Sequence, residues 1–84
     1  MELSIGQVVK SKAGRDGEKF LAVIELRDGY ALICDGKERP IERPKRKNPM
    51  HLAPTRHKLG KESMETNRAL RKALREFASG ESEG

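Results

Sequence analysis

The first 36 residues contain short runs rich in apolar and β-branched side chains, separated by polar segments with glycine, which is typical of short β-strands. Three such runs occupy residues 5–11, 19–26 and 30–34, and the second is the richest in apolar and β-branched side chains. Because β-branched residues favour extended backbone, these runs predict three strands in the N-terminal part of the chain.

Two Asp-Gly pairs, at residues 28–29 and 35–36, separate these extended segments. An Asp-Gly pair between two strands is a strong signal for a tight hairpin, since a type I′ turn needs positive φ at both central residues. The second, third and fourth strands are therefore expected to be antiparallel neighbours, with the fourth at about residues 39–43. A fifth extended piece is expected at residues 50–53, between two prolines. Five short strands with few aromatic residues predict a small, strongly bent β-barrel.

The C-terminal part changes to a helical period. Leu70, Leu74 and Phe77 are spaced i, i+4, i+7, which predicts an amphipathic helix within residues 63–80. The pattern leaves open whether this apolar stripe packs on the barrel or binds a partner. The cations expected on its other faces are Arg68, Arg71, Lys72 and Arg75.

A chain of 84 residues fits one small domain. We divide it into a barrel at residues 1–55, a basic linker at 56–62, the helix at 63–80 and a disordered tail at 81–84. The predicted fold class is mostly β with one C-terminal α-helix.

Neither a leader nor a membrane span is evident in the sequence. The start, MELSIGQVVK, lacks the basic and apolar regions of a signal peptide, and the longest apolar run, residues 20–24, is only five residues long. The single cysteine, Cys34, cannot form an internal disulfide and is expected to be a small core residue. We therefore expect a soluble cytoplasmic protein, monomeric and without contact to a membrane.

Positive charge is concentrated in the middle of the chain. The net charge is +5, yet residues 1–36 and 62–84 each carry −1, whereas residues 37–61 carry +7. A positive field confined to one stretch indicates a partner that is a polyanion. Aromatic residues make up only 4% of the chain, so recognition is expected to depend on phosphates and shape rather than on stacked bases.

Catalytic and metal-binding chemistry have little support in the sequence. His51, His57 and Cys34 are too few and too widely spaced for a structural zinc site, and His51 is expected to be partly buried between Met50 and Leu52. No serine has an evident histidine partner, and the glycines near residue 15 lack the spacing of a phosphate-binding loop. We expect no enzymatic activity, no metal and no cofactor.

Two motifs carry a resemblance to a known family. The stretch IGQVVKSKAGRDGEKFLAVIELRDGYALICDG places alternating apolar residues around a central glycine, with Gly6 and Gly14 in position. It resembles the KOW motif of ribosomal and transcription proteins. The later stretch RPKRKNPMHLAPT is similar to the basic segment of large-ribosomal-subunit proteins of the fourteen-e type. The matching residues there are Lys45, Arg46, Lys47, Asn48, Met50, His51, Leu52, Pro54 and Thr55.

This resemblance implies an SH3-like barrel that binds structured ribosomal RNA and associates with ribosomes in translation, with other ribosomal proteins as further candidate partners. We expect a strand at Met50, His51 and Leu52 to dock into the barrel and to fix the basic clusters before and after it on one side. The candidate RNA-binding residues are Lys12, Arg15, Lys37, Arg39, Arg43, Lys45, Arg46, Lys47, Arg56, His57 and Lys58. The alternatives are a protein-interaction module, using the barrel or the helix, and a DNA-binding protein, because phosphate contacts are common to both nucleic acids.

Overall fold

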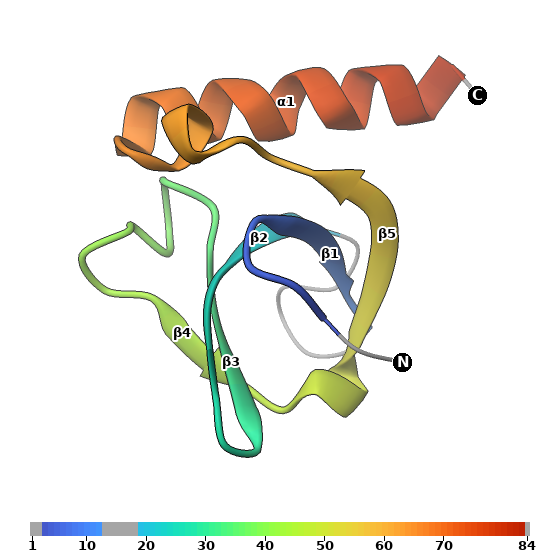
Figure 1. Cartoon of the computed structure of the whole chain (residues 1–84). Helices are drawn as coiled ribbons and strands as arrows, with labels where there is room; N and C mark the ends of the chain where they lie inside the picture. The colour runs from blue at the N-terminus through green and yellow to red at the C-terminus, as the bar shows by residue number, and fades with distance from the viewer. Residues whose placement is uncertain (1–2, 13–18, 84) are drawn as a thin grey trace.

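The computed structural model describes residues 3–12 and 19–83 as one sheet covered by one helix (Figure 1). The C-terminal helix lies across the outside of the bent sheet (Figure 1). The elements in chain order are β1 (Gln7–Ser11), β2 (Phe20–Arg27), β3 (Tyr30–Cys34), β4 (Lys45–Lys47), the 3₁₀ turn η1 (Pro49–His51), β5 (Leu52–Lys58), the 3₁₀ turn η2 (Lys61–Met64) and α1 (Asn67–Glu83).

The strands pair in the order β4-β3-β2-β1-β5, and every pair is antiparallel. The first four strands form a meander, and β5 returns to pair with β1 on the far edge. This confirms the predicted fold class, a mostly β chain of about five strands followed by one α-helix. The sheet is not closed, however, because within the described residues β4 and β5 are edges that do not pair with each other.

The first predicted hairpin is confirmed. Arg27 pairs with Tyr30 across a two-residue loop, and Gly29 has a φ of 84°, the left-handed conformation that such a turn requires.

The second predicted hairpin, at residues 35–36, is wrong. Asp35 Oδ1 accepts hydrogen bonds from the backbone amides of Lys37 and Arg39, both at 2.9 Å, and the Asp35 amide donates to the Arg39 carbonyl. These local bonds close a compact loop in place of a strand-to-strand turn. Pro40 follows this loop and has no N–H group to donate to a neighbouring strand. The fourth strand therefore forms at Lys45–Lys47 and not at residues 39–43.

The expected strand at residues 50–53 is also wrong in position. Asn48 Oδ1 accepts a hydrogen bond from the Met50 amide and caps the 3₁₀ turn η1. Met50 is consequently 79% exposed and His51 is exposed, whereas Leu52 is 2% exposed and belongs to the core. The expected burial of Met50 and His51 is therefore wrong. Strand β5 runs on to Lys58, so the sheet includes the first three residues of the segment expected as a linker.

The sheet has an apolar core on each face. The inner face holds one cluster, which consists of Val9, Leu21, Val23, Ala31, Ile33 and Leu52. On the outer face, Leu70 and Leu74 of α1 pack against Val8, Ala22 and Cys34. Val8 therefore packs in the outer core and Val9 in the inner core, since successive side chains of a strand point to opposite faces. The outer core settles the question that the helix pattern left open, because the apolar stripe of α1 packs on its own sheet.

Two glycines allow close contact between segments. Gly36 has a φ of 79°, and a Cβ atom there would lie 2.5 Å from the carbonyl oxygen of Asn67. Gly6, expected as part of the structural motif, has a φ of 90°, and its Cβ would lie 2.8 Å from the carbonyl oxygen of Leu59. Both positions therefore exclude larger residues. Gly14, the other motif glycine, lies outside the described residues.

Helix α1 begins at Asn67, after η2, because Thr66 Oγ1 accepts a hydrogen bond from the Ala69 amide as an N-cap. Asn67 Oδ1 then accepts from the Ile41 amide at 2.7 Å and ties the start of α1 to the loop before β4. None of the helices in the described part of the chain has both the length and the apolar character needed to cross a membrane.

Candidate nucleic-acid interface

The basic cluster on β4 is divided between the two faces of the sheet. Lys45 pairs with Ile33 and Lys47 with Ala31, and both partners belong to the inner core. Directly paired residues share a face, so these two lysines lie on the inner side at the edge of the sheet. Arg46 points the other way, and its guanidinium carbon lies 4.9 Å from the centre of the Tyr30 ring. The three cations therefore do not form one array.

The second basic cluster lies on the opposite edge of the sheet. Arg56, His57 and Lys58 are exposed at the end of β5, close to α1, whereas β4 lies away from that end (Figure 1). The prediction that both basic clusters lie on one side of the molecule is therefore wrong. The structure places the β5 cluster beside the helix.

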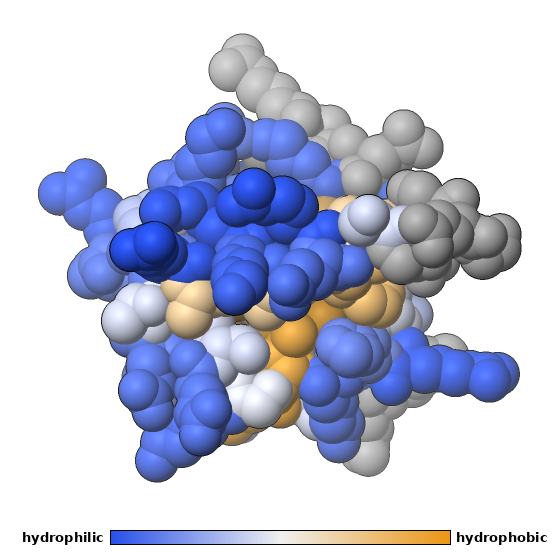
Figure 2. Space-filling view, turned by 90° about the horizontal axis from the view of Figure 1, so that it is seen from above, coloured by the Kyte–Doolittle hydropathy of each residue, from blue (hydrophilic) through white to orange (hydrophobic). Residues whose placement is uncertain are grey.

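Helix α1 supplies a further set of cations on its solvent side. Arg68, Arg71, Lys72 and Arg75 are all exposed, opposite the buried Leu70 and Leu74. The spacing of three and four residues places them along the solvent side of the helix. We call this set, together with Lys37, the helix face. Figure 2, seen from the side that carries α1, shows a broad hydrophilic surface with a smaller hydrophobic strip beside it.

Lys37 joins these helix cations through the loop after β3. An open hollow of about 550 Å³ is lined by Asp35, Lys37, Arg71 and Arg75. Arg71 Nη1 donates to the carbonyl oxygen of Gly36 at 2.8 Å, which fixes the loop against the helix. The Asp35 carboxylate accepts hydrogen bonds from two backbone amides of this loop and so stabilises the conformation of the loop. An acidic side chain that does interrupt the helix face is the exposed Glu76.

The remaining predicted site residues are dispersed. Arg43 is exposed in the loop before β4, and Arg39 is half-buried within that loop. Lys12 is exposed, and its amide donates a hydrogen bond to the carbonyl oxygen of His51 in η1. Arg15 lies outside the described residues. Of the predicted set, the structure thus brings Lys37 and the β5 cluster to the side of α1 and leaves the β4 cluster away from it.

Aromatic rings gather where β5 meets α1, which the low aromatic content did not suggest. The Phe77 ring lies 5.0 Å from the His57 ring at 30°, and 5.0 Å from the Phe20 ring in an edge-to-face arrangement. Lys10 pairs with Phe20 in the sheet, and its Nζ lies 5.7 Å from the centre of that ring. These residues come from distant segments of the chain. Their contact could be predicted from the sequence only if the register of the strands were already known.

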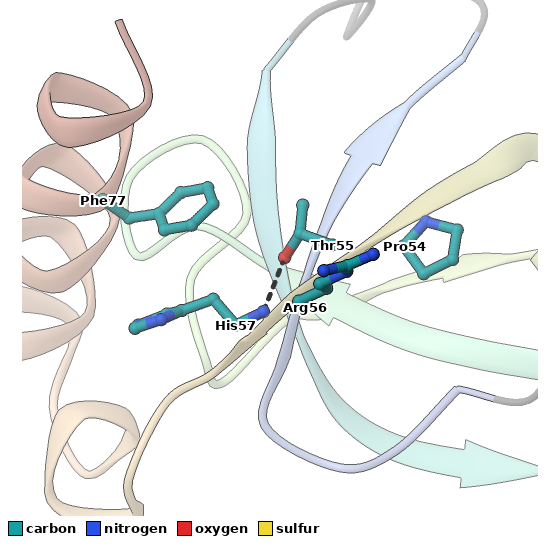
Figure 3. A pocket seen from close by; sticks show the side chains of 5 residues that line it. All are labelled: Pro54, Thr55, Arg56, His57 and Phe77. Atoms are coloured by element: carbon teal, nitrogen blue, oxygen red, sulfur yellow. Dashed lines mark hydrogen bonds between the residues drawn. The ribbon is translucent and has the colours of Figure 1, made fainter. Parts of the chain in front are cut away.

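An open hollow lies beside these rings. It measures about 470 Å³ and is lined by Pro54, Thr55, Arg56, His57 and Phe77 (Figure 3). We call it the aromatic hollow. Phe77 projects from α1 toward β5, and the other four residues follow one another along that strand (Figure 3). Thr55 fixes the strand here, because its hydroxyl donates to the Val8 carbonyl at 2.7 Å and accepts from the His57 amide at 3.2 Å.

Reactive groups are few in the described structure. Burial of Cys34 in the outer core raises the pKa of its thiol from 9.0 to about 12, with smaller contributions from the Asp35 and Glu42 charges, so the thiolate is scarce at neutral pH. In residues 3–12 and 19–83, no three His, Cys, Asp or Glu side chains gather in a way that could hold a metal ion.

Comparison of the chain with protein-family models finds no match, and comparison with curated proteins finds none either.

Proposed function

We propose that this protein binds structured RNA through the phosphates, with the helix face as its main contact surface and Arg56 and Lys58 as its extension. The observation that carries the proposal is the fixed row of four helix cations beside Lys37. Burial of Leu70 and Leu74 fixes the rotation of α1, and this rotation leaves the cations facing solvent. Cations on a rigid element lose less conformational entropy on binding than cations on a mobile tail.

The choice of RNA over other polyanions rests on the resemblance of residues 5–55 to the KOW motif and to the basic segment of the fourteen-e ribosomal proteins. On that basis the target is ribosomal RNA, the protein associates with ribosomes, and its location is the cytoplasm. The sheet with β5 returned to β1 is compatible with the SH3-like arrangement that the resemblance implies.

The proposal is tested by two matched double substitutions. Arg68→Glu with Arg75→Glu reverses charge on the helix face, and Arg43→Glu with Arg46→Glu makes the same change in charge near β4. All four side chains are exposed, so both variants should keep nearly the wild-type melting temperature. Affinity for a structured ribosomal RNA fragment is measured against salt. We expect the helix variant to bind much more weakly and to lose about 2 from the magnitude of its log–log salt slope, with a smaller change for the other variant.

A larger loss in the Arg43–Arg46 variant would move the interface to β4, as the sequence alone suggested. Equal affinity in both variants and the wild type would contradict phosphate binding by any of these cations.

A second candidate function, binding of another protein, is favoured by Met50. This side chain is 79% exposed on the tight turn η1, between two edge strands. A photo-crosslinking residue at position 50 tests it in cells, with the same residue at position 72 for comparison. A single defined protein adduct at position 50, with RNA adducts absent at position 72, would favour this second function.

A further inference from the structure

The aromatic hollow combines stacked rings with nearby cations. The exposed His57 ring lies against the half-buried Phe77 ring, and Phe20 contacts Phe77 edge to face. The Phe77 ring is therefore held between two other rings. A ring fixed in this way offers a flat surface for stacking at little entropic cost.

The charge around the hollow favours a polyanion. Arg56 lines it, Lys58 follows on the same strand, and Lys10 lies on the neighbouring strand above Phe20. The five residues that line the hollow include no carboxylate. A proline-rich peptide carries no anionic groups for these cations, whereas a nucleic-acid strand supplies both a base to stack and phosphates for the cations.

We propose that the aromatic hollow receives one unpaired base of the bound RNA, which stacks against the His57–Phe77 pair while Arg56 and Lys10 neutralise the adjoining phosphates. This inference rests on the proposed RNA binding and adds to it a contact with a base. The Thr55 hydroxyl already donates to Val8, and the Thr55 carbonyl accepts from Gln7 Nε2 at 2.8 Å. With these Thr55 groups engaged inside the sheet, the base is held by stacking and not by hydrogen bonds to Thr55.

The test compares two single-stranded RNA octamers with equal numbers of phosphates. One carries a base at every position, and the other is abasic at its four central positions. The wild type should bind the complete octamer about tenfold more tightly, which is within the range of stacking one base on an aromatic side chain. A 2-aminopurine at the centre of the complete octamer should lose fluorescence on binding, because stacking quenches it.

Three variants assign this preference to the hollow. His57→Ala removes an exposed ring, and Phe77→Leu removes the ring but keeps most of the apolar volume in the outer core. Each should bind both octamers with nearly equal affinity, close to that of the wild type for the abasic one, and should quench 2-aminopurine less. His51→Ala is the matched control, since His51 is also exposed but lies on η1, and it should keep the preference. Melting temperatures establish that all three variants fold.

The outcomes separate this inference from the proposed function. If the wild type binds both octamers equally well, or if His57→Ala and Phe77→Leu keep the preference, the hollow does not hold a base and phosphate binding stands alone. If the wild type binds neither octamer nor a structured RNA at low salt, both proposals fall. Backbone amide shifts at Thr55 and His57 on addition of a proline-rich peptide but not of RNA would assign the hollow to a protein partner and overturn the inference.

Discussion

The Arg71 guanidinium donates a hydrogen bond to the carbonyl oxygen of Gly36 across 2.8 Å, and this contact joins the N-terminal part of α1 to the loop that follows β3. The same loop supplies Lys37, so one interaction fixes both the packing of the helix and the position of a cation beside it. Its geometry depends on the absence of a side chain at residue 36.

Replacing Gly36 with alanine should destabilise the protein strongly. The new Cβ would meet the Asn67 carbonyl at 2.5 Å in a backbone conformation with a φ of 79°. We expect a loss of about 3 kcal/mol in the free energy of unfolding, measured by urea denaturation. Gly29→Ala is the matched control, since its φ is 84° but the added Cβ meets no atom of the described residues within 4 Å beyond its chain neighbours, and it should cost only about 1–2 kcal/mol. Equal losses in the two variants would show that α1 does not approach the loop closely.

Removing the Leu70 side chain tests the outer core. Leu70 is fully buried between α1 and the sheet, so Leu70→Ala should lower the free energy of unfolding by about 2–5 kcal/mol. Met50→Ala, at an apolar residue that is 79% exposed, should change it by no more than about 0.5 kcal/mol. A small effect at Leu70 would mean that the helix is not docked on the sheet in solution.

Cys34 should make stability depend on pH in the alkaline range. Burial raises the pKa of its thiol from 9.0 to about 12, so above about pH 9 the unfolded chain releases a proton that the folded chain retains. This contribution is complete below about pH 9 and is lost as the pH rises toward about 12. Unfolding curves of the wild type and Cys34→Ala between these limits measure it, and the variant should lose less stability over the interval. Parallel curves would contradict the raised pKa.

The salt dependence of RNA binding should be steep. If about five phosphates are neutralised, the slope of log affinity against log salt should lie between about −3.5 and −4.5, from single-strand to duplex values. Fluorescence anisotropy of a labelled RNA between low and physiological salt provides the measurement. A flat response would exclude the cations of the helix face as the main contact.

The sequence correctly predicted elements whose conformation depends on residues close together in the chain. The turn at residues 28–29 and the apolar stripe of Leu70 and Leu74 could be recognised from neighbouring residues alone, and both are confirmed. The loop that begins at Asp35 does not form the predicted hairpin, because the Asp35 side chain accepts hydrogen bonds from the amides of Lys37 and Arg39. An Asp-Gly pair in the sequence does not reveal these hydrogen bonds.

The site was harder to predict than the fold. The run at residues 45–47 reads as one basic cluster, yet strand geometry sends Arg46 to one face and its neighbours to the other. The aromatic hollow depends on contacts between residues 20, 57 and 77 that only the folded chain brings together. Met50 looked like a core residue by its apolar character, but the cap from Asn48 turns the backbone outward there.

The unclosed sheet has a consequence for the behaviour of separate copies of the chain. The edge strands of a sheet are where a strand of another molecule can add to it. Lys45 and Lys47 on one edge point inward, and Arg56 and Lys58 stand along the other, so a second molecule approaching either edge would have to bring lysines and arginines against its own. Repulsion between these positively charged edges thus protects the open sheet from pairing with other copies, as closure protects a complete barrel.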